Sequence, residues 1–367
     1  MKAPFFSDKP GEPRPAKPGA MTSRERWLAL FARQKPDRVP TDYWATPEAT
    51  RKLMRRLGCR TRRRMLDTLG VDYEVHLEPR YAGPRLPSMQ DEFGRRFRSV
   101  DYGSGSYREC IHFPLAGFKT VAEIEKNYVW PTADWWDFTD IPAQARRNET
   151  HPIRGGGSEP FLIYKELRGM EQAFVDLVEN PEIAHYCLGK LFDLAYDKAV
   201  RIYEAIPGRV DISYVAEDMG GQTDLMISVR HIREFLLPGM KRMIDLAHQA
   251  GAHAFHHNDG SCWRIIPDMI GLGIDLLNPL QWRCPGMERE RLKSEFGPHL
   301  VLHGGMDNQH TLPFGTVDEV RREVEDNLRI LGAGGGYILA PCHNIQAITP
   351  VENVLAMYEA TRELGRL

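Results

Sequence analysis

The second half of the chain alternates between short apolar runs and longer amphipathic stretches. Residues 210–216 have the apolar composition of a strand and run into the polar pair Glu217 and Asp218. Between residues 229 and 249 apolar side chains recur at spacings of three and four, which predicts a helix. Residues 252–257 follow as the next predicted strand.

The same alternation continues toward the C-terminus and predicts parallel βαβ units. Each predicted strand runs into Gly, His, Asp, Asn or Pro, and no GxGxxG loop follows an early strand, which argues against a dinucleotide-binding sheet. We therefore expect an α/β fold, a (β/α)₈ TIM barrel whose active site lies at the C-terminal ends of the strands. Further helices are expected at 265–272, 289–296, 318–331 and from Thr349 onward, and further strands at 274–277, 300–302 and 337–340.

The first half is less regular, and we expect it to form an elaborated N-terminal region of the same domain. The pattern predicts a helix over 24–33 and a short strand over 39–44. Residues 80–115 are rich in Gly, Pro and aromatics and are interpreted as hairpins and loops, 155–160 as a glycine turn and 161–177 as a helix. The Pro- and Lys-rich residues 1–20 are expected to be a disordered tail, which leaves 21–367 as a single domain.

Charge and cysteine usage narrow the class of protein. The 48 basic and 50 acidic residues nearly cancel, so no overall field favours nucleic acid or an anionic membrane. The sequence has no run of eighteen apolar residues and no secretory h-region, and its six cysteines form no CxxC pair. We therefore expect reduced thiols and a cytoplasmic location.

Four sequence blocks resemble the uroporphyrinogen decarboxylase superfamily, over a region from about Thr22 to the C-terminus. They are Arg33–Pro40, Arg168-Gly-Met-Glu-Gln, His303-Gly-Gly-Met-Asp and His343-Asn-Ile-Gln followed by Thr349-Pro350. The resemblance implies a (β/α)₈ barrel and one of two activities. One is decarboxylation of uroporphyrinogen without a cofactor. The other is zinc-dependent transfer of a methyl group between a small compound and a corrinoid held by a partner protein.

The sequence departs from both branches of that family. The N-terminal arginines with which the decarboxylases handle their substrate are missing, because no arginine lies between Arg38 and Arg51. Buried carboxylates without cationic partners are costly. The methyltransferases bind metal with a His-x-Cys pair and a third ligand after the last strand. Here Asp259 follows His257 in place of that cysteine, and His343 takes the place of the final one.

These three residues are the candidate metal ligands. His257 and Asp259 lie two positions apart beyond a predicted strand, so both side chains can point to the same side, and His343 follows another strand. Two imidazoles and a carboxylate suit Zn²⁺ with an open position, and also Fe²⁺ or Mn²⁺. The alternative is that the histidines bind an organic acid without metal and that Asp259 orients one of them.

Other polar and aromatic residues are candidates for supporting roles. Glu217, Asp218 and Asp307, together with Asp259, are candidate catalytic groups. His303, Gln281, Tyr43, Trp44 and Arg168 are candidates for substrate binding, and Trp130, Trp135 and Trp136 either line an aromatic substrate or pack the protein.

Three functional hypotheses follow. The first is a metal-dependent methyltransferase that transfers a methyl group from a small methylated substrate to a corrinoid. The corrinoid would arrive on a partner protein, because the sequence has no Asp-x-His-x-x-Gly cobalamin loop. The second is a decarboxylase of a porphyrinogen or a smaller organic acid, and the third a non-catalytic small-molecule-binding barrel.

Overall fold

Seven parallel strands form one sheet in the computed structural model, which describes residues 19–366. Neighbouring strands pair in parallel, so all their C-terminal ends lie at one edge of the sheet. The order is β1 (Val75–His76), β6 (Ile153–Ser158), β7 (Ile212–Val215), β8 (His253–His257), β9 (Leu276–Leu280), β10 (Val301–Met306) and β11 (Tyr337–Pro341).

Residues 40–42 link the two ends of this sheet. The amide of Asp42 donates to Leu339 of β11, and the amide of Leu339 donates to Pro40. On its other side the carbonyl of Thr41 accepts from Asp72, three residues before β1. The α/β class and the curled parallel sheet are thus confirmed. The strand predicted over 39–44 is present only as an isolated parallel bridge between Thr41 and Leu339. Of the eight strands expected for the barrel, the sheet contains seven within residues 19–366.

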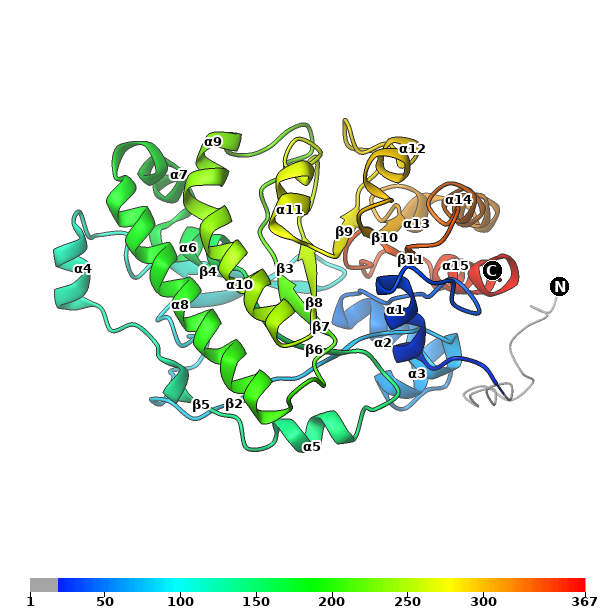
Figure 1. Ribbon diagram of the computed structural model, residues 1–367, viewed down its shortest axis with the longest axis horizontal. Helices are drawn as coiled ribbons and strands as arrows, with labels where there is room; N and C mark the ends of the chain where they lie inside the picture. The colour runs from blue at the N-terminus through cyan, green and yellow to red at the C-terminus, as the bar shows by residue number, and fades with distance from the viewer. Residues whose placement is uncertain (1–18, 367) are drawn as a thin grey trace.

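The helices that follow the strands agree closely with the predicted ones. In Figure 1, α8 and α10 cross in front of the strands, and α14 and α15 lie together beyond β10 and β11. The long predicted helix is α9 (Val229–His231), a π-helical turn at Ile232–Leu236 and α10 (Leu237–Gln249). The others are α11 (Ile266–Leu272), α12 (Arg289–Arg291) with a π-helical turn at Leu292–Phe296, α13 (Thr311–Phe314), α14 (Val317–Ile330) and α15 (Val351–Leu364).

The inner face of the curled sheet has its own apolar core. One side chain from each of five consecutive strands, Ile212, Phe255, Leu276, Val301 and Ile338, joins a single buried cluster. Helix α1 (Ser23–Phe31) adds Trp27 and Leu30 to this cluster, so it covers the inner face of the sheet. The capping box of Thr22 and Glu25 explains why this helix begins at Ser23. A packed interior of this kind is typical of barrel folds and contains no pore.

The N-terminal half contains two corrections to the sequence analysis. Residues 155–160 do not form a turn, because most of them belong to strand β6 and the next helix begins at Pro160. The helix expected over 161–177 is broken at Gly169, and the 25-residue helix α8 (Pro181–Ala205) was not anticipated. The other elements are α2 (Pro47–Arg56), α3 (Arg62–Leu69), β2 (Arg80–Tyr81), β3 (Arg96–Asp101), β4 (Ser106–His112), α4 (Val121–Asn127), a 3-10 helix Ala133–Trp135, β5 (Trp136–Asp137), α5 (Ile141–Arg146), α6 (Pro160–Arg168) and α7 (Met170–Glu179).

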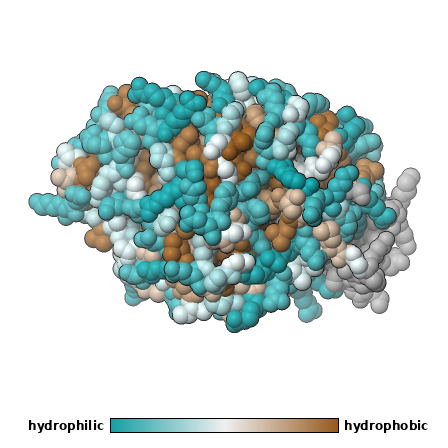
Figure 2. All heavy atoms as spheres, in the orientation of Figure 1, coloured by the Kyte–Doolittle hydropathy of each residue, from teal (hydrophilic) through white to brown (hydrophobic). Residues whose placement is uncertain are grey.

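The pair β3–β4 forms a small antiparallel sheet, as expected for the hairpin region 80–115, and β2 pairs antiparallel with β5, which lies outside that region. The disordered tail predicted for residues 1–20 lies almost wholly outside the described residues. Within residues 19–366 no helix has both the length and the apolar character needed to cross a bilayer. On the face drawn in Figure 2, hydrophobic residues are scattered among hydrophilic ones.

Candidate functional site

A layer of polar and aromatic residues lies immediately above the apolar inner core. Side chains alternate along a strand, so the residue two positions after each core residue points into the same space. On β8, Phe255 is followed in this way by His257. The same step gives Tyr214 on β7, Asn278 on β9, His303 on β10 and Ala340 on β11. This layer lies toward the C-terminal ends of the strands and forms the floor of the candidate site.

The candidate metal ligands converge at this end of the sheet. One ligand atom each from His257, Asp259 and His343 lies within 4.8 Å of the other two. Nε2 of His343 is 3.5 Å from Oδ2 of Asp259, and Nε2 of His257 is 3.8 Å from the same oxygen. Oδ1 of Asp218 is also 3.8 Å from Nε2 of His257. The structure therefore brings together the three predicted ligands and one predicted catalytic acid.

The polar atoms of this cluster fit a bound cation. Oδ1 of Asp259 is buried and has no hydrogen-bond partner within residues 19–366. Burial raises the pKa of Asp259, although His257 and His343 act in the opposite direction. Two further acids, Glu159 and Glu217, lie nearby and have raised pKa values. Burial and the charge of Asp218 raise the pKa of Glu159 to about 7, and burial raises the pKa of Glu217 well above its usual value. A divalent cation would offset this concentration of acids.

The amide of Asn278 fixes the orientation of His257. Its oxygen accepts from Nδ1 of His257 at 2.5 Å, and its nitrogen donates to Nδ1 of His303 at 2.6 Å. Because an amide nitrogen only donates, His303 carries its proton on Nε2, which contacts Asp42 at 3.0 Å. His257 correspondingly carries its proton on Nδ1, so the lone pair of Nε2 is directed to the cluster. Metal-binding histidines are commonly held by such a second hydrogen bond.

Asp42 anchors the far end of this chain of hydrogen bonds. Burial opposes its ionised form, but hydrogen bonds from His303, the amide of Tyr43 and Nε1 of Trp44 outweigh it and lower its pKa. The sequence analysis did not single out Asp42 or Asn278. Asn278 lies two positions after Leu276, the core residue of β9, and this spacing would have pointed to it. The same spacing leads from Val301 of β10 to His303, which the sequence analysis had named.

Tyr43 and Trp44 point to opposite sides, as neighbours in an extended segment must. The ring of Trp44 stacks on His257 with centroids 5.3 Å apart, so it forms a wall of the site. Tyr43 donates to or accepts from Thr50 and packs near Tyr358 of α15, away from the cluster. The structure therefore supports a site position for Trp44 and a packing role for Tyr43.

The loops after β7 and β8 lie against each other and position Asp218 and Asp259. The side chain of Asn258 accepts from the amides of Met219 and Gly220, and a Cβ at Gly220 would lie 2.3 Å from the carbonyl of Asp259. Gln281, a predicted substrate-binding residue, accepts from the amide of Gly260 and so holds the same loop. Glu217 is fully buried and accepts from the amide of Phe161, which places it behind the loops.

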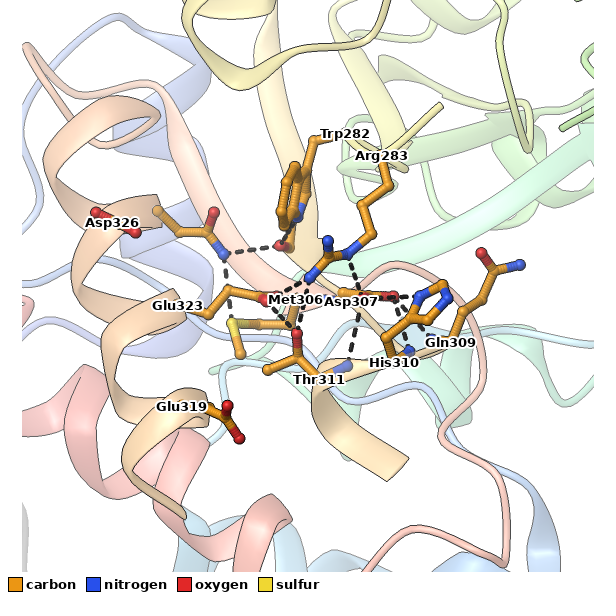
Figure 3. A network of polar contacts seen from close by, with 12 residues as sticks. Trp282, Arg283, Met306, Asp307, Gln309, His310, Thr311, Glu319, Glu323 and Asp326 are labelled. Atoms are coloured by element: carbon orange, nitrogen blue, oxygen red, sulfur yellow. Dashed lines mark hydrogen bonds and ion pairs between the residues drawn. The ribbon is translucent and has the colours of Figure 1, made fainter. Parts of the chain in front are cut away.

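Asp307 belongs to a separate polar network, shown in Figure 3. Its carboxylate pairs with Arg283 at 2.5 Å and accepts from the amides of residues 309–311, so it shapes the turn that leads into α13. Its amide donates to Glu323, which also accepts from Thr311. The His257–Asp259–His343 cluster does not include Asp307, and its contacts support a structural role, so its catalytic role stays a prediction.

Arg168 is buried in a charged pair. Only 1% of it is exposed, and it pairs with the fully buried Asp176 at 2.6 Å. Its Nη1 donates to the carbonyls of Leu115 and Phe118. Four of the five N–H groups of the guanidinium thus have acceptors within the protein. These contacts support a packing role, and substrate binding by Arg168 stays a prediction. Asp176 also accepts from Tyr164 and Gln172, which explains why this part of the chain packs around a charged pair.

A cavity of about 430 Å³ adjoins the cluster between β6 and α8. We call it the β6–α8 cavity. Tyr214, whose ring lies 5.8 Å from that of His257, forms part of its wall, as does Glu159. Its charged and polar lining further includes Arg154, Ser158 and Lys198, and its apolar lining includes Phe93, Trp136 and Leu191. Of the tryptophans considered from sequence, Trp44 and Trp136 reach the site region.

Comparison with known proteins agrees with this architecture. The family model described as Uroporphyrinogen decarboxylase (URO-D) matches residues 141–364, a range that contains His257, Asp259 and His343. A curated uroporphyrinogen decarboxylase of Anaeromyxobacter dehalogenans is 27% identical over 220 residues, which span 58% of this chain and 59% of that protein. Its counterpart in Shewanella pealeana is 24% identical over 316 residues, which span 81% of this chain and 74% of that protein.

Among solved structures, a methyltransferase from Methanosarcina mazei has a TM-score of 0.67. The match covers 94% of this chain and 99% of that one, at 20% sequence identity. At this identity the match demonstrates a shared fold. Asp42 and Trp44 lie before the residues that the family model matches, so the N-terminal part of the site is known from the structure and not from that match.

Proposed function

Since this chain belongs to the uroporphyrinogen decarboxylase (URO-D) family, we propose that it is a metal-dependent methyltransferase of that family. It transfers a methyl group from a small methylated substrate to a corrinoid. Because the sequence has no cobalamin loop of its own, the corrinoid arrives on a partner protein. A cytoplasmic location, which six free thiols favour, is part of the same proposal.

The observation that carries the proposal is the convergence of His257, Asp259 and His343. Two imidazoles and a carboxylate leave a coordination position open on Zn²⁺, with Fe²⁺ or Mn²⁺ as alternatives. His257, Asp259 and His343 would hold this metal, which would supply Lewis acidity to the oxygen that carries the methyl group. Asn278 holds the Nε2 lone pair of His257 toward the cluster.

The remaining residues of the site have roles that need no cofactor. When the methyl group leaves as a cation equivalent, the substrate oxygen keeps the electron pair and must gain a proton. Glu159, with a pKa of about 7, holds a proton beside the cluster at neutral pH and is the proposed donor. Trp44 lies over His257 and limits the access of water from that side.

Decarboxylation of uroporphyrinogen is less well supported. The segment around Asp42, which in the decarboxylases carries arginines for the substrate carboxylates, has none between Arg38 and Arg51. The nearest cationic groups of the cavity, Arg154 and Lys198, are too few for an octa-anion. Decarboxylation of a smaller acid is the alternative that the experiment below must distinguish.

An assay with free cob(I)alamin tests the proposal directly. Purified protein is incubated with a panel of methoxyl and methylthio compounds, and methylcob(III)alamin is followed by its absorbance. We expect turnover that a chelator abolishes and Zn²⁺, Fe²⁺ or Mn²⁺ restores. His343→Ala should lose this turnover, whereas His299→Ala, which removes an exposed histidine outside the cluster, should retain it. Metal-independent release of CO₂ from a carboxylic acid, without methyl transfer, would instead establish a decarboxylase.

A further inference from the structure

The β6–α8 cavity contains three hydrogen-bond donors that lack acceptors among residues 19–366. Oγ of Ser158 is buried without a partner, and Ser158 as a whole is 7% exposed. Nε of Arg154 is likewise buried without a partner. The ammonium group of Lys198 lies 3.9 Å from the centre of the Trp136 ring and makes no hydrogen bond or ion pair within the described residues. Donors left unsatisfied in a cavity are costly unless a ligand accepts from them.

Acidic groups lie near these cations but do not accept hydrogen bonds from the three donors. Glu78 contacts His76 at 3.1 Å, and together with Glu92 it favours the charged form of Lys198 against the effect of burial. Arg154 lies 3.3 Å from Glu74, but burial and Asp42 raise the pKa of Glu74 to about 8. The contact with Glu74 is made by Nη1 of Arg154 and leaves its Nε without an acceptor.

The cavity also has apolar walls, beside the acidic side chains of Glu78, Glu92 and Glu159. Phe93, Trp136, Leu191 and Ile163 supply flat and aliphatic surface. At the β6 wall, Gly156 and Gly157 lie in close contact with the protein, since a Cβ at Gly156 would lie 2.8 Å from the hydroxyl of Tyr203 and one at Gly157 2.3 Å from the carbonyl of Tyr214. Tyr214 lies between the cavity and His257, because it lines the cavity and its ring centroid is 5.8 Å from that of His257.

We infer that the β6–α8 cavity binds the carboxylate of a small organic acid, with Lys198, Arg154 and Ser158 as its donors. The apolar walls hold the body of the acid. That this acid is the methyl-bearing substrate rests on the proposed function, whereas the binding of a carboxylate does not. A carboxylate can accept from several donors at once, so the site suits a single acidic group.

Calorimetric titration of the purified protein with benzoate, cyclohexanecarboxylate and benzamide tests this inference. The two carboxylates should bind, and benzamide, which has the same shape as benzoate without its charge, should bind at least about 10-fold more weakly. Lys198→Met should weaken benzoate binding by about 10- to 100-fold, the usual range for losing a charge-assisted hydrogen bond. The matched control is Lys190→Met on the same helix, because Lys190 is exposed, lies over Tyr186 and does not line the cavity. It should leave benzoate binding unchanged.

Two results would overturn the inference. One is equal binding of benzoate and benzamide. The other is benzoate binding that survives Lys198→Met, because the acid would then be held elsewhere, for instance on a metal. If Lys198→Met does not fold, benzoate binding that survives Ser158→Ala would overturn the inference in the same way. Zinc titration of the same variants separates this inference from the proposed function. A protein that binds benzoate through Lys198 but binds no zinc would retain the acid site and lose the methyltransferase.

Discussion

His257 donates from Nδ1 to the side-chain oxygen of Asn278. This contact joins the candidate metal cluster to the buried pair of His303 and Asp42, since the same amide donates to His303. The residues come from β8, β9, β10 and the segment that links the sheet ends. The orientation of one candidate metal ligand is therefore determined by side chains that do not themselves reach the cluster.

Replacing Asn278 should weaken metal binding without removing any ligand. We expect Asn278→Leu to lower zinc affinity by about 10- to 100-fold, because His257 loses the acceptor that fixes its Nδ1 proton. Asn278→Asp keeps an oxygen acceptor and should retain affinity within a few-fold of the unmodified protein. Competition titration with a zinc indicator measures both. Equal affinities for all three proteins would show that Asn278 does not position His257.

Asp259→Ala should abolish activity and most metal binding while the protein stays folded. Asp259 lies on a loop after β8, and its buried Oδ1 has no partner in the described part of the chain. Its free energy of unfolding should therefore change by less than about 1 kcal/mol, or even rise slightly in the metal-free protein. Thermal melts and metal titration of the same variant measure the two effects. An unfolded variant whose folded fraction keeps full activity would make Asp259 structural.

Arg168→Met should destabilise the protein strongly. It would leave Asp176, which is fully buried, without its cationic partner, and breaking a buried pair from one side costs about 3–5 kcal/mol. The control Arg98→Met removes the exposed pair with Glu109 and should cost at most about 1 kcal/mol. Urea denaturation gives both free energies of unfolding. A small effect of Arg168→Met would reopen a role for this residue outside packing.

Glu159 should make the metal-free protein less stable as the pH rises. Its pKa is about 7 in the folded protein and 4.5 ordinarily, so the folded state keeps a proton that the unfolded chain releases between these values. Stability is therefore lost as the pH rises from about 4.5 to 7, by about 1–3 kcal/mol. Glu159→Gln should remove this loss.

Free energies of unfolding of the chelator-treated protein at pH 5 and pH 8 test this pH dependence. The difference between Glu159→Gln and the unmodified protein should grow in favour of the variant as the pH increases. Glu179→Gln, at an exposed position, serves as the control. A difference that stays constant with pH would contradict a raised pKa at Glu159.

Much of the fold could be predicted from sequence where the signal is local. The strands and helices after residue 210 follow from periodicity, since each apolar run of four to six residues ends at a turn-forming residue. Strand β6 was misread because three consecutive glycines in Ile153–Ser158 are typical of a turn. Those glycines are tolerated in the strand because Ala199, Tyr203 and Tyr214 pack closely against it, which is a tertiary property.

The candidate site could be predicted in part for the same reason. His257, Asp259 and His343 were identifiable from residue type and strand-end placement, and the structure brings them together. Asp42 was not identifiable, because its partner His303 lies 261 positions away and no local pattern joins the two. The roles predicted for Arg168 and Asp307 stay predictions, and sequence could not show that nearby acids or bases already pair with these charged side chains.

The central claim is that His257, Asp259 and His343 hold a divalent metal. Elemental analysis of protein purified without chelator tests it most directly, with His343→Ala and His299→Ala purified in parallel. We predict about one equivalent of zinc, iron or manganese per chain in the unmodified protein and in His299→Ala, and much less in His343→Ala. Absence of metal from the unmodified protein, with no binding of added Zn²⁺, Fe²⁺ or Mn²⁺, would contradict the account.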